Sequence, residues 1–150
     1  MADLKTRSAK DADFNFCWRV YSESVRALLA PHIKGGWESE VEQQKFRKIW
    51  APQRSHIVTL DGKPIGWFAF REEGDNVIFE HAYLQEDQRG KKIGSTLLDF
   101  VLQEAKRRGK KKLMFEALLN SESKKFFDSN GFVESGKGST PASVQMHRTI

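Results

Sequence analysis

The chain has 150 residues and a formal net charge of +5, and 39% of its residues are hydrophobic. This length and composition are typical of one folded domain over residues 1–150, with a core that needs no metal or disulfide, and they exclude a disordered tail. The positive charge suits an anionic ligand or weak contact with nucleic acid.

The sequence also bears on where the protein resides. No stretch reaches the roughly 18 apolar residues that a membrane span requires, and the polar first residues lack a signal-peptide core. We therefore expect a soluble, cytoplasmic protein. The single cysteine, Cys17, cannot form an internal disulfide, and its aromatic neighbours favour a core thiol over a nucleophile.

The first elements in chain order are a predicted strand over residues 4–8 and a helix. Asp11 or Asp13 offers the N-cap of this helix, and Pro31 ends it. Its apolar side chains recur with the helical period. They are Phe14, Cys17, Trp18, Tyr21, Val25, Leu28 and Leu29.

A flexible link over residues 35–38 leads to a second predicted helix. Ser39 and Glu42 have the spacing of a capping box, which predicts that the helix begins there. Its apolar positions again follow the helical period. They are Val41, Phe46, Ile49 and Trp50.

Three β-prone segments then predict an antiparallel meander. They cover residues 56–60, 65–71 and 77–84. Asp61-Gly62 is typical of a tight hairpin turn, and residues 74–76 supply the second turn. The third strand leads directly into a charged loop that contains glycine.

Residues 85–98 pass through this loop into a helix. The first turn of a helix has unpaired backbone N–H groups and a partial positive charge, so this geometry collects anions such as phosphate. Arg89, Lys91 and Lys92 add mobile positive charge at the same place. The spacing fits neither a P-loop nor a dinucleotide-binding motif.

The last third predicts further strands and a short helix. Gly109 is the expected C-cap of the preceding helix, and Asn120 or Ser121 caps the short one. The order of elements predicts an α/β (α+β) protein. The remaining strands are expected at residues 112–118, 132–135 and 143–149.

The charged loop resembles the acetyl-CoA pyrophosphate loop of the GNAT superfamily of N-acetyltransferases, whose pattern is Gln/Arg-x-x-Gly-x-Gly/Ala. Arg89 takes the first position and Gly94 the last. Lys92 stands where the family usually has its first glycine.

A second segment resembles the other GNAT signature, Asn-x-x-Ala-x-x-x-Tyr-x-x-x-Gly-Phe. Asn120, Gly131 and Phe132 match it, Ser123 replaces the alanine, and Phe127 stands where the tyrosine is expected. Both motifs occur in the family's order, and the upstream segments look like those of small prokaryotic members without an assigned substrate.

This resemblance implies the GNAT fold, a central mixed and mostly antiparallel sheet flanked by helices. It implies an enzyme that uses acetyl-CoA as cosubstrate, without a metal, and a small-molecule or peptide amine as acceptor. It also implies that cofactor contacts come from the two motifs and the strand before them. These residues are Ala82, Tyr83, Leu84, Arg89, Gly90, Lys91, Lys92, Ile93, Gly94, Ser95, Asn120, Ser123 and Phe127.

In GNAT proteins the first two helices and their connection form one wall of the acceptor cleft. By that resemblance Trp37 and Glu38 are candidates for contacts with the substrate. The alternative for Trp37 is a loop aromatic that only covers the core.

Candidate catalytic residues follow from the chemistry of amine acetylation. The amine must be neutral to attack, so a base is expected within hydrogen-bond reach. Glu80 and His81 are the candidates, and because adjacent strand residues face opposite sides, at most one looks into the cleft. Glu80 is favoured because apolar neighbours would raise its pKa, and Glu116 is a third candidate. The expected neighbours are Ile78, Ala82 and Leu84.

The leaving thiolate receives its proton, in many family members, from the tyrosine that Phe127 replaces here. Water can protonate a thiolate near neutral pH, since a thiol has a pKa of about 8.5. Tyr83 or Tyr21 are alternative sources of a hydroxyl, although both types of position are often simply packed. Loss of catalysis is the other outcome.

Competing functions remain open from the sequence. One is an acyl-CoA sensor of the same fold without turnover, suggested by Lys92 and Phe127. The sequence argues against nucleic-acid binding, because the basic cluster at residues 106–112 closes a helix and complements its dipole. A homodimer is possible, and no sequence feature decides it.

Overall fold

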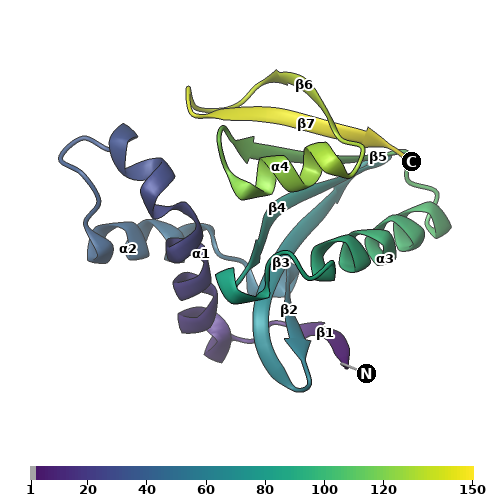
Figure 1. The fold of residues 1–150 in the computed structure, drawn as a ribbon, viewed down its shortest axis with the longest axis horizontal. Coiled ribbons are helices and arrows are strands. Elements are labelled where there is room, and N and C mark those ends of the chain that lie inside the picture. The colour runs from purple at the N-terminus through teal and green to yellow at the C-terminus, as the bar shows by residue number, and fades with distance from the viewer. Residues whose placement is uncertain (1–2) are drawn as a thin grey trace.

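The computed structural model describes residues 3–150, which form one mixed sheet with helices packed on both faces (Figure 1). Within these residues, no helix combines the length and apolarity needed to cross a bilayer. The α-helices are α1 (Phe14–Leu29), α2 (Ser39–Ile49), α3 (Ile93–Arg107) and α4 (Glu122–Ser129). The strands are β1 (Leu4–Ser8), β2 (Ser55–Leu60), β3 (Lys63–Glu73), β4 (Asn76–Leu84), β5 (Lys112–Leu118), β6 (Val133–Lys137) and β7 (Ser143–Thr149).

The seven-stranded sheet has the order β1-β2-β3-β4-β5-β7-β6. Strands β4 and β5 are parallel and the other neighbours are antiparallel, which confirms the predicted mixed, mostly antiparallel sheet. The β4–β5 pairing runs from Asn76–Lys112 to Phe79–Phe115. Beyond Phe79 the two strands part (Figure 1).

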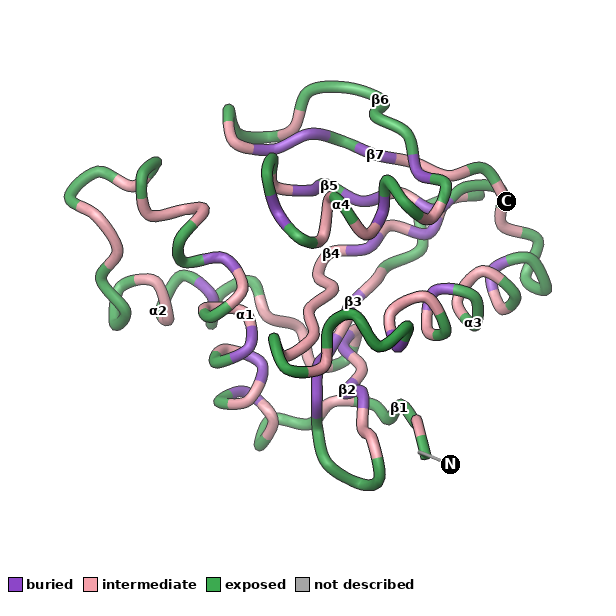
Figure 2. The backbone as a smooth tube through the Cα atoms, in the orientation of Figure 1, coloured by how far each residue is buried: buried purple, intermediate pink, exposed green. Residues whose placement is uncertain are grey.

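The two faces of the sheet pack on different helices. On one face, Phe79 of β4 and Phe115 of β5 pack with residues of α3 and α4. On the other face, Trp67 of β3 packs with residues of α1 and α2, including Cys17. Buried segments therefore follow the central strands and the inner sides of the helices (Figure 2). Cys17 is fully buried, which confirms the core thiol, and this burial raises its pKa to about 12.

Several local signals in the sequence are confirmed. Asp61 and Gly62 both have positive φ, as a two-residue hairpin turn requires, and they join β2 to β3. Gly109 ends α3 with φ 74°. The hydroxyl of Ser121 accepts a hydrogen bond from the N–H of Lys124 at 2.9 Å and caps α4.

The side chains predicted to cap α1 and α2 form no capping hydrogen bonds. The capping box at Ser39 is wrong, because Glu38 is the N-cap of α2 and the Ser39 hydroxyl instead accepts from the indole N–H of Trp37 at 3.3 Å. Asp13 does occupy the N-cap of α1, but its carboxylate binds Arg7 rather than the first turn of the helix. Tertiary partners thus take the side chains that local spacing assigns to caps.

A β-bulge interrupts β4 at Glu80. Ala69 of β3 pairs with His81, whereas the next residue, Phe70, pairs with Phe79, so Glu80 has no partner across the ladder. After the bulge the side chains exchange faces: His81 packs on Trp67 toward α1 and α2, and Ala82 packs on the opposite face. The expectations that Glu80 shares a face with Ala82 and that strict alternation separates Glu80 from His81 are therefore wrong.

Candidate active site

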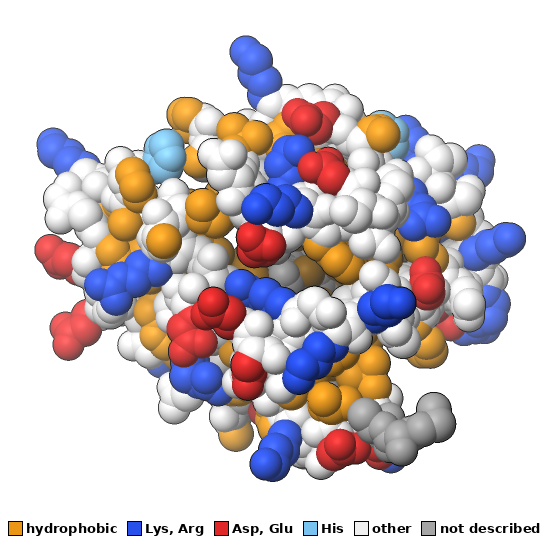
Figure 3. All heavy atoms as spheres, in the orientation of Figure 1, with side chains coloured by type: hydrophobic (Ala, Val, Ile, Leu, Met, Phe, Trp, Pro, Cys, Tyr) orange, Lys and Arg blue, Asp and Glu red, His pale blue; other side chains and the backbone are white. Residues whose placement is uncertain are grey.

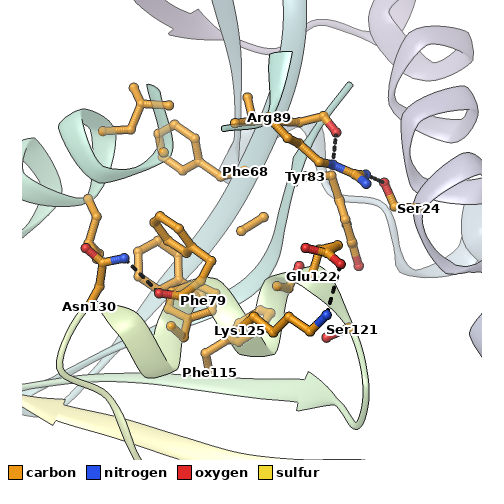
Figure 4. Close-up of a pocket in the computed structure, with 18 of the residues that line it drawn as sticks. Ser24, Phe68, Phe79, Tyr83, Arg89, Phe115, Ser121, Glu122, Lys125 and Asn130 are labelled. Carbon is orange, nitrogen blue, oxygen red and sulfur yellow. Dashed lines mark hydrogen bonds and ion pairs between the residues drawn. The ribbon is translucent and has the colours of Figure 1, made fainter. Parts of the chain in front are cut away.

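A cavity of about 680 Å³ lies where β4 and β5 part. Residues of α1, β4, the start of α3, β5 and α4 line it (Figure 4). Figure 3 shows this face hollowed near its centre, with apolar side chains in the hollow and charged ones around it. Among the predicted cofactor residues, Lys91 does not line the cavity. Those that do are Ala82, Tyr83, Leu84, Arg89, Gly90, Lys92, Ile93, Gly94, Ser95, Asn120, Ser123 and Phe127.

The N-terminus of α3 forms one end of this cavity. Lys92 is the N-cap and adopts the left-handed conformation, with φ 62° and ψ 11°. Glycine takes this conformation without strain. This gives a physical reason why the GNAT pyrophosphate-loop pattern usually has a glycine at this position. The N–H groups from Ile93 to Ser95 have no acceptor within the helix, and all three residues line the cavity. This end can therefore bind an anion.

Arg89 makes two hydrogen bonds at the edge of the cavity. Its Nε donates to the Leu84 carbonyl at 3.2 Å and its Nη2 donates to the Ser24 hydroxyl at 3.1 Å (Figure 4). Through these two hydrogen bonds, the guanidinium of Arg89 connects the end of β4 to α1. Its positive charge is fixed beside the anion-binding end.

Gly94 marks the close approach of α3 and α4. A Cβ atom on this residue would lie 2.9 Å from Cε1 of Phe126. The side chain of Asn130 donates to the Phe126 carbonyl at 2.7 Å and fixes the same turn of α4 (Figure 4). Any larger residue at Gly94 must therefore displace the Phe126 ring or enter the cavity.

Phe127 lies in the aromatic core beneath the cavity. Its side chain is 3% exposed, and its ring centroid is 4.4 Å from that of Phe115 and 4.8 Å from that of Phe132. Phe127 has no hydroxyl, so the position that resembles the family's tyrosine supplies packing here and no proton.

A tyrosine and a histidine meet at the end of β4. The Tyr83 hydroxyl lies 3.3 Å from Nδ1 of His81, and Tyr83 lines the cavity. Burial raises the pKa of Tyr83 well above its usual range, and burial lowers the pKa of His81 to about 4. At neutral pH the pair therefore consists of a protonated phenol beside a neutral imidazole.

Glu80 sits beside this pair in a charged setting, and not in the apolar one predicted. Its Oε1 accepts from Nε of Arg54 at 2.7 Å, and its Oε2 accepts from Nη2 at 3.1 Å. Arg54 belongs to η3 (Pro52–Arg54), and a second guanidinium, from Arg71, is 3.7 Å away. The bulge turns the carboxylate toward these two arginines.

Glu116, the third candidate base, lines the cavity from β5. Its Oε1 accepts from the N–H of Ser139 at 2.9 Å, and its Oε2 accepts from the hydroxyls of Ser139 at 2.6 Å and Ser143 at 3.1 Å. Partial burial raises the pKa of this carboxyl, but the hydrogen bonds outweigh it and the net pKa lies below the ordinary value. Glu116 is therefore an ionised group at neutral pH.

The structure places Trp37 and Glu38 apart from the cavity. The Trp37 indole stacks on Trp18, with ring centroids 6.2 Å apart and an interplanar angle of 13°. Glu38 uses its carbonyl to accept the N–H of Glu42 at the start of α2. Their role as substrate contacts stays a prediction.

Sequence reasoning missed three residues that the structure brings to the site. Ser24 of α1 and Phe126 of α4 line the cavity, and Arg54 holds Glu80. Ser24 lies on a helix assigned to the core, and Arg54 lies in a link that carries no motif. Only the position of Phe126 within the second motif could have suggested its role.

The cavity, with an anion-binding helix start at one end and ionisable side chains at the other, has the organisation of an acyl-carrier-dependent transferase. The profile of the acetyltransferase (GNAT) family matches residues 18–132. The chain therefore belongs to the GNAT family of acetyltransferases. A search of curated proteins finds no match.

Solved structures of N-acetyltransferases share this fold. PaiA N-acetyltransferase from Thermoplasma acidophilum, in complex with coenzyme A, is similar with a TM-score of 0.77, 17% identity and 99% coverage of both chains. The ribosomal-protein-S18-alanine N-acetyltransferase from Escherichia coli gives 0.69 and 18%, over 99% of this chain and 94% of that chain. N-acetylglutamate synthase from Neisseria gonorrhoeae, complexed with coenzyme A and N-acetyl-glutamate, gives 0.67 and 16%, over 99% of this chain and 35% of that chain.

Proposed function

We propose that this protein transfers an acetyl group from acetyl-CoA to a primary amine by direct attack within a ternary complex. The observation that carries this proposal is the cavity at the β4–β5 divergence, which joins the N-terminus of α3 to Tyr83, whose hydroxyl contacts His81. The residues present fit coenzyme A, because free N–H groups and the charges of Arg89 and Lys92 suit its phosphates. Acetyl-CoA supplies the thioester.

In the proposed reaction, Glu80 and Tyr83 carry out the two proton transfers. The amine nitrogen forms a bond to the acetyl carbon, and the bond between that carbon and sulfur breaks. Glu80 takes the proton that the amine loses, because each carboxylate oxygen keeps a free lone pair beside its bond to Arg54. Tyr83 passes its hydroxyl proton to the thiolate while water returns a proton to the phenol oxygen, so that no buried phenolate is left, and His81 positions that hydroxyl.

A sensor that binds acyl-CoA without turnover is the second candidate function. The observation that favours it is Phe127, whose buried ring carries no hydroxyl at the position of the motif tyrosine. The acceptor class, a small-molecule or peptide amine, and a cytoplasmic location belong to the proposal as well. A buried free thiol at Cys17 suits a reducing compartment.

The test is calorimetric titration with acetyl-CoA and with CoA, followed in the same sample by thiol release on addition of a mixture of amines. Binding with amine-dependent thiol release is the expected result. Binding without release would establish the sensor instead. Failure to bind either molecule would contradict both functions, and the fold would then be all that the protein shares with these acetyltransferases.

A further inference from the structure

Among the residues that the structure describes, one carboxylate of the cavity lining has no paired cation. Within residues 3–150, Glu116 pairs with no Lys or Arg, and its oxygens accept bonds from an N–H and from hydroxyls. The other acidic residue of the lining, Glu122, pairs with Lys125 at 3.3 Å (Figure 4). An unpaired carboxylate in a cavity attracts a cationic group of a ligand more strongly than a paired one does.

The position of Glu116 separates it from the phosphate end. Glu116 directly follows Phe115, the last residue of β5 that pairs with β4, so it stands where the strands begin to part. The cationic lining residues Arg89 and Lys92 lie around the N-terminus of α3. The cavity therefore offers positive charge at the start of α3 and an unpaired negative charge where β4 and β5 part.

The surroundings of Glu116 indicate which nitrogen it can bind. Because three hydrogen bonds stabilise its ionised form, an ammonium paired with Glu116 is stabilised in its protonated form. A protonated nitrogen has no lone pair with which to attack a thioester. Glu116 is thus suited to a positive charge other than the reacting amine.

We propose that Glu116 binds a second cationic group of the acceptor, and that the acceptors of this enzyme are amines that carry another positive charge. This inference rests on the proposed acetyl transfer and adds the substrate class. Ser139 and Ser143, in the segment after β6 and at the start of β7, fix the carboxylate in its orientation. The reacting amine then lies toward Glu80 and Tyr83.

The test compares three acceptors of equal chain length: 1,5-diaminopentane, 5-aminopentan-1-ol and pentylamine. We expect kcat/KM for the diamine to exceed that for the amino alcohol by at least about 10-fold, as for one charge-assisted contact. The variant Glu116→Gln keeps a side chain of the same shape that can still bond to the serines. It is expected to lose this preference, mainly through KM of the diamine, and to keep its affinity for acetyl-CoA.

The matched control is Glu122→Gln, which removes a paired carboxylate from the same cavity and is expected to keep the diamine preference. Equal kcat/KM for the three acceptors in the wild type would overturn the inference while leaving acetyl transfer intact. An equal loss for all three in Glu116→Gln would also overturn it, because Glu116 would then act on the reacting amine or on the fold. Absence of acetyl-CoA binding in the wild type would instead remove the proposed function.

Discussion

The two ends of the cavity use different chemical groups, backbone N–H groups at one end and side chains at the other. The phosphate end uses backbone N–H groups of one contiguous turn, from Ile93 to Ser95, with cations beside them. The opposite end uses individual side chains, Tyr83 of β4 and Glu116 of β5, which are held by His81 and by the segment between β6 and β7. Because backbone donors persist after most substitutions, a variant disrupts the start of α3 only by filling the space beside it. At the opposite end, a variant acts by removing a single side-chain atom or charge.

The largest effect should come from Gly94→Trp, because a Cβ there already meets Phe126 and an indole must enter the cavity. We expect the affinity for CoA to fall by more than about 100-fold, since the phosphates lose the N–H groups of α3. Calorimetry measures the affinity, and circular dichroism checks the fold. The control is Phe100→Trp, which places the same indole on the exposed side of α3. Unchanged affinity in a folded Gly94→Trp variant would assign the phosphate site to another loop.

At the opposite end, Tyr83→Phe removes one oxygen and keeps the packing. If this hydroxyl protonates the thiolate, kcat should fall by about 100-fold with little change in acetyl-CoA affinity. Steady-state thiol release measures kcat. Tyr21→Phe is the control, because the Tyr21 ring packs edge-on against Tyr83 at 5.5 Å but does not line the cavity. Equal effects of the two substitutions would contradict the assignment.

Glu80→Gln tests the proposed base. Turnover at neutral pH should fall by about 10-fold or more, because the amide cannot take up a proton, while acetyl-CoA affinity stays the same. The pH–rate profile is the measurement. Glu72→Gln is the matched control, since Glu72 is also paired with an arginine, Arg108 at 2.7 Å, and pairs with Val77 at the end of β4 away from Tyr83. A profile that Glu80→Gln leaves unaltered would reduce Glu80 to an ion-pair partner of Arg54.

The buried histidine predicts a pH-dependent stability. The pKa of His81 is about 4 in the folded protein and about 6.5 in an unfolded chain. As the pH falls through this window the unfolded chain binds the proton first, so the folded state loses up to about 3 kcal/mol between pH 6.5 and 4. Urea unfolding at pH 7 and pH 4.5 should show a smaller loss for His81→Gln than for the wild type. The same loss in both proteins would mean that His81 takes up its proton without unfolding.

The sequence predicted the elements around the start of α3 better than the surroundings of Glu80 for a physical reason. A strand, a charged loop and a helix start are local features, so residues 84–98 reveal both the element order and the anion site. The bulge at Glu80 arises from a register change between β3 and β4, and no local pattern of β4 predicts it. The predicted apolar setting of Glu80 failed for this reason, and the capping box at Ser39 failed because Trp37 takes its hydroxyl.

The smallest expected effect concerns Lys92, where the phosphate end departs from the motif. Lys92→Gly should raise the free energy of unfolding by about 1 kcal/mol, because φ 62° strains a residue with a side chain. The same substitution removes a cation. The change in CoA affinity therefore combines a loss from the missing charge with a gain from closer approach of the phosphate to the backbone. Lys92→Ala separates the two, since alanine loses the charge and keeps the strain. If thermal unfolding gave the two variants equal stability, strain at the start of α3 would not explain the glycine of the motif.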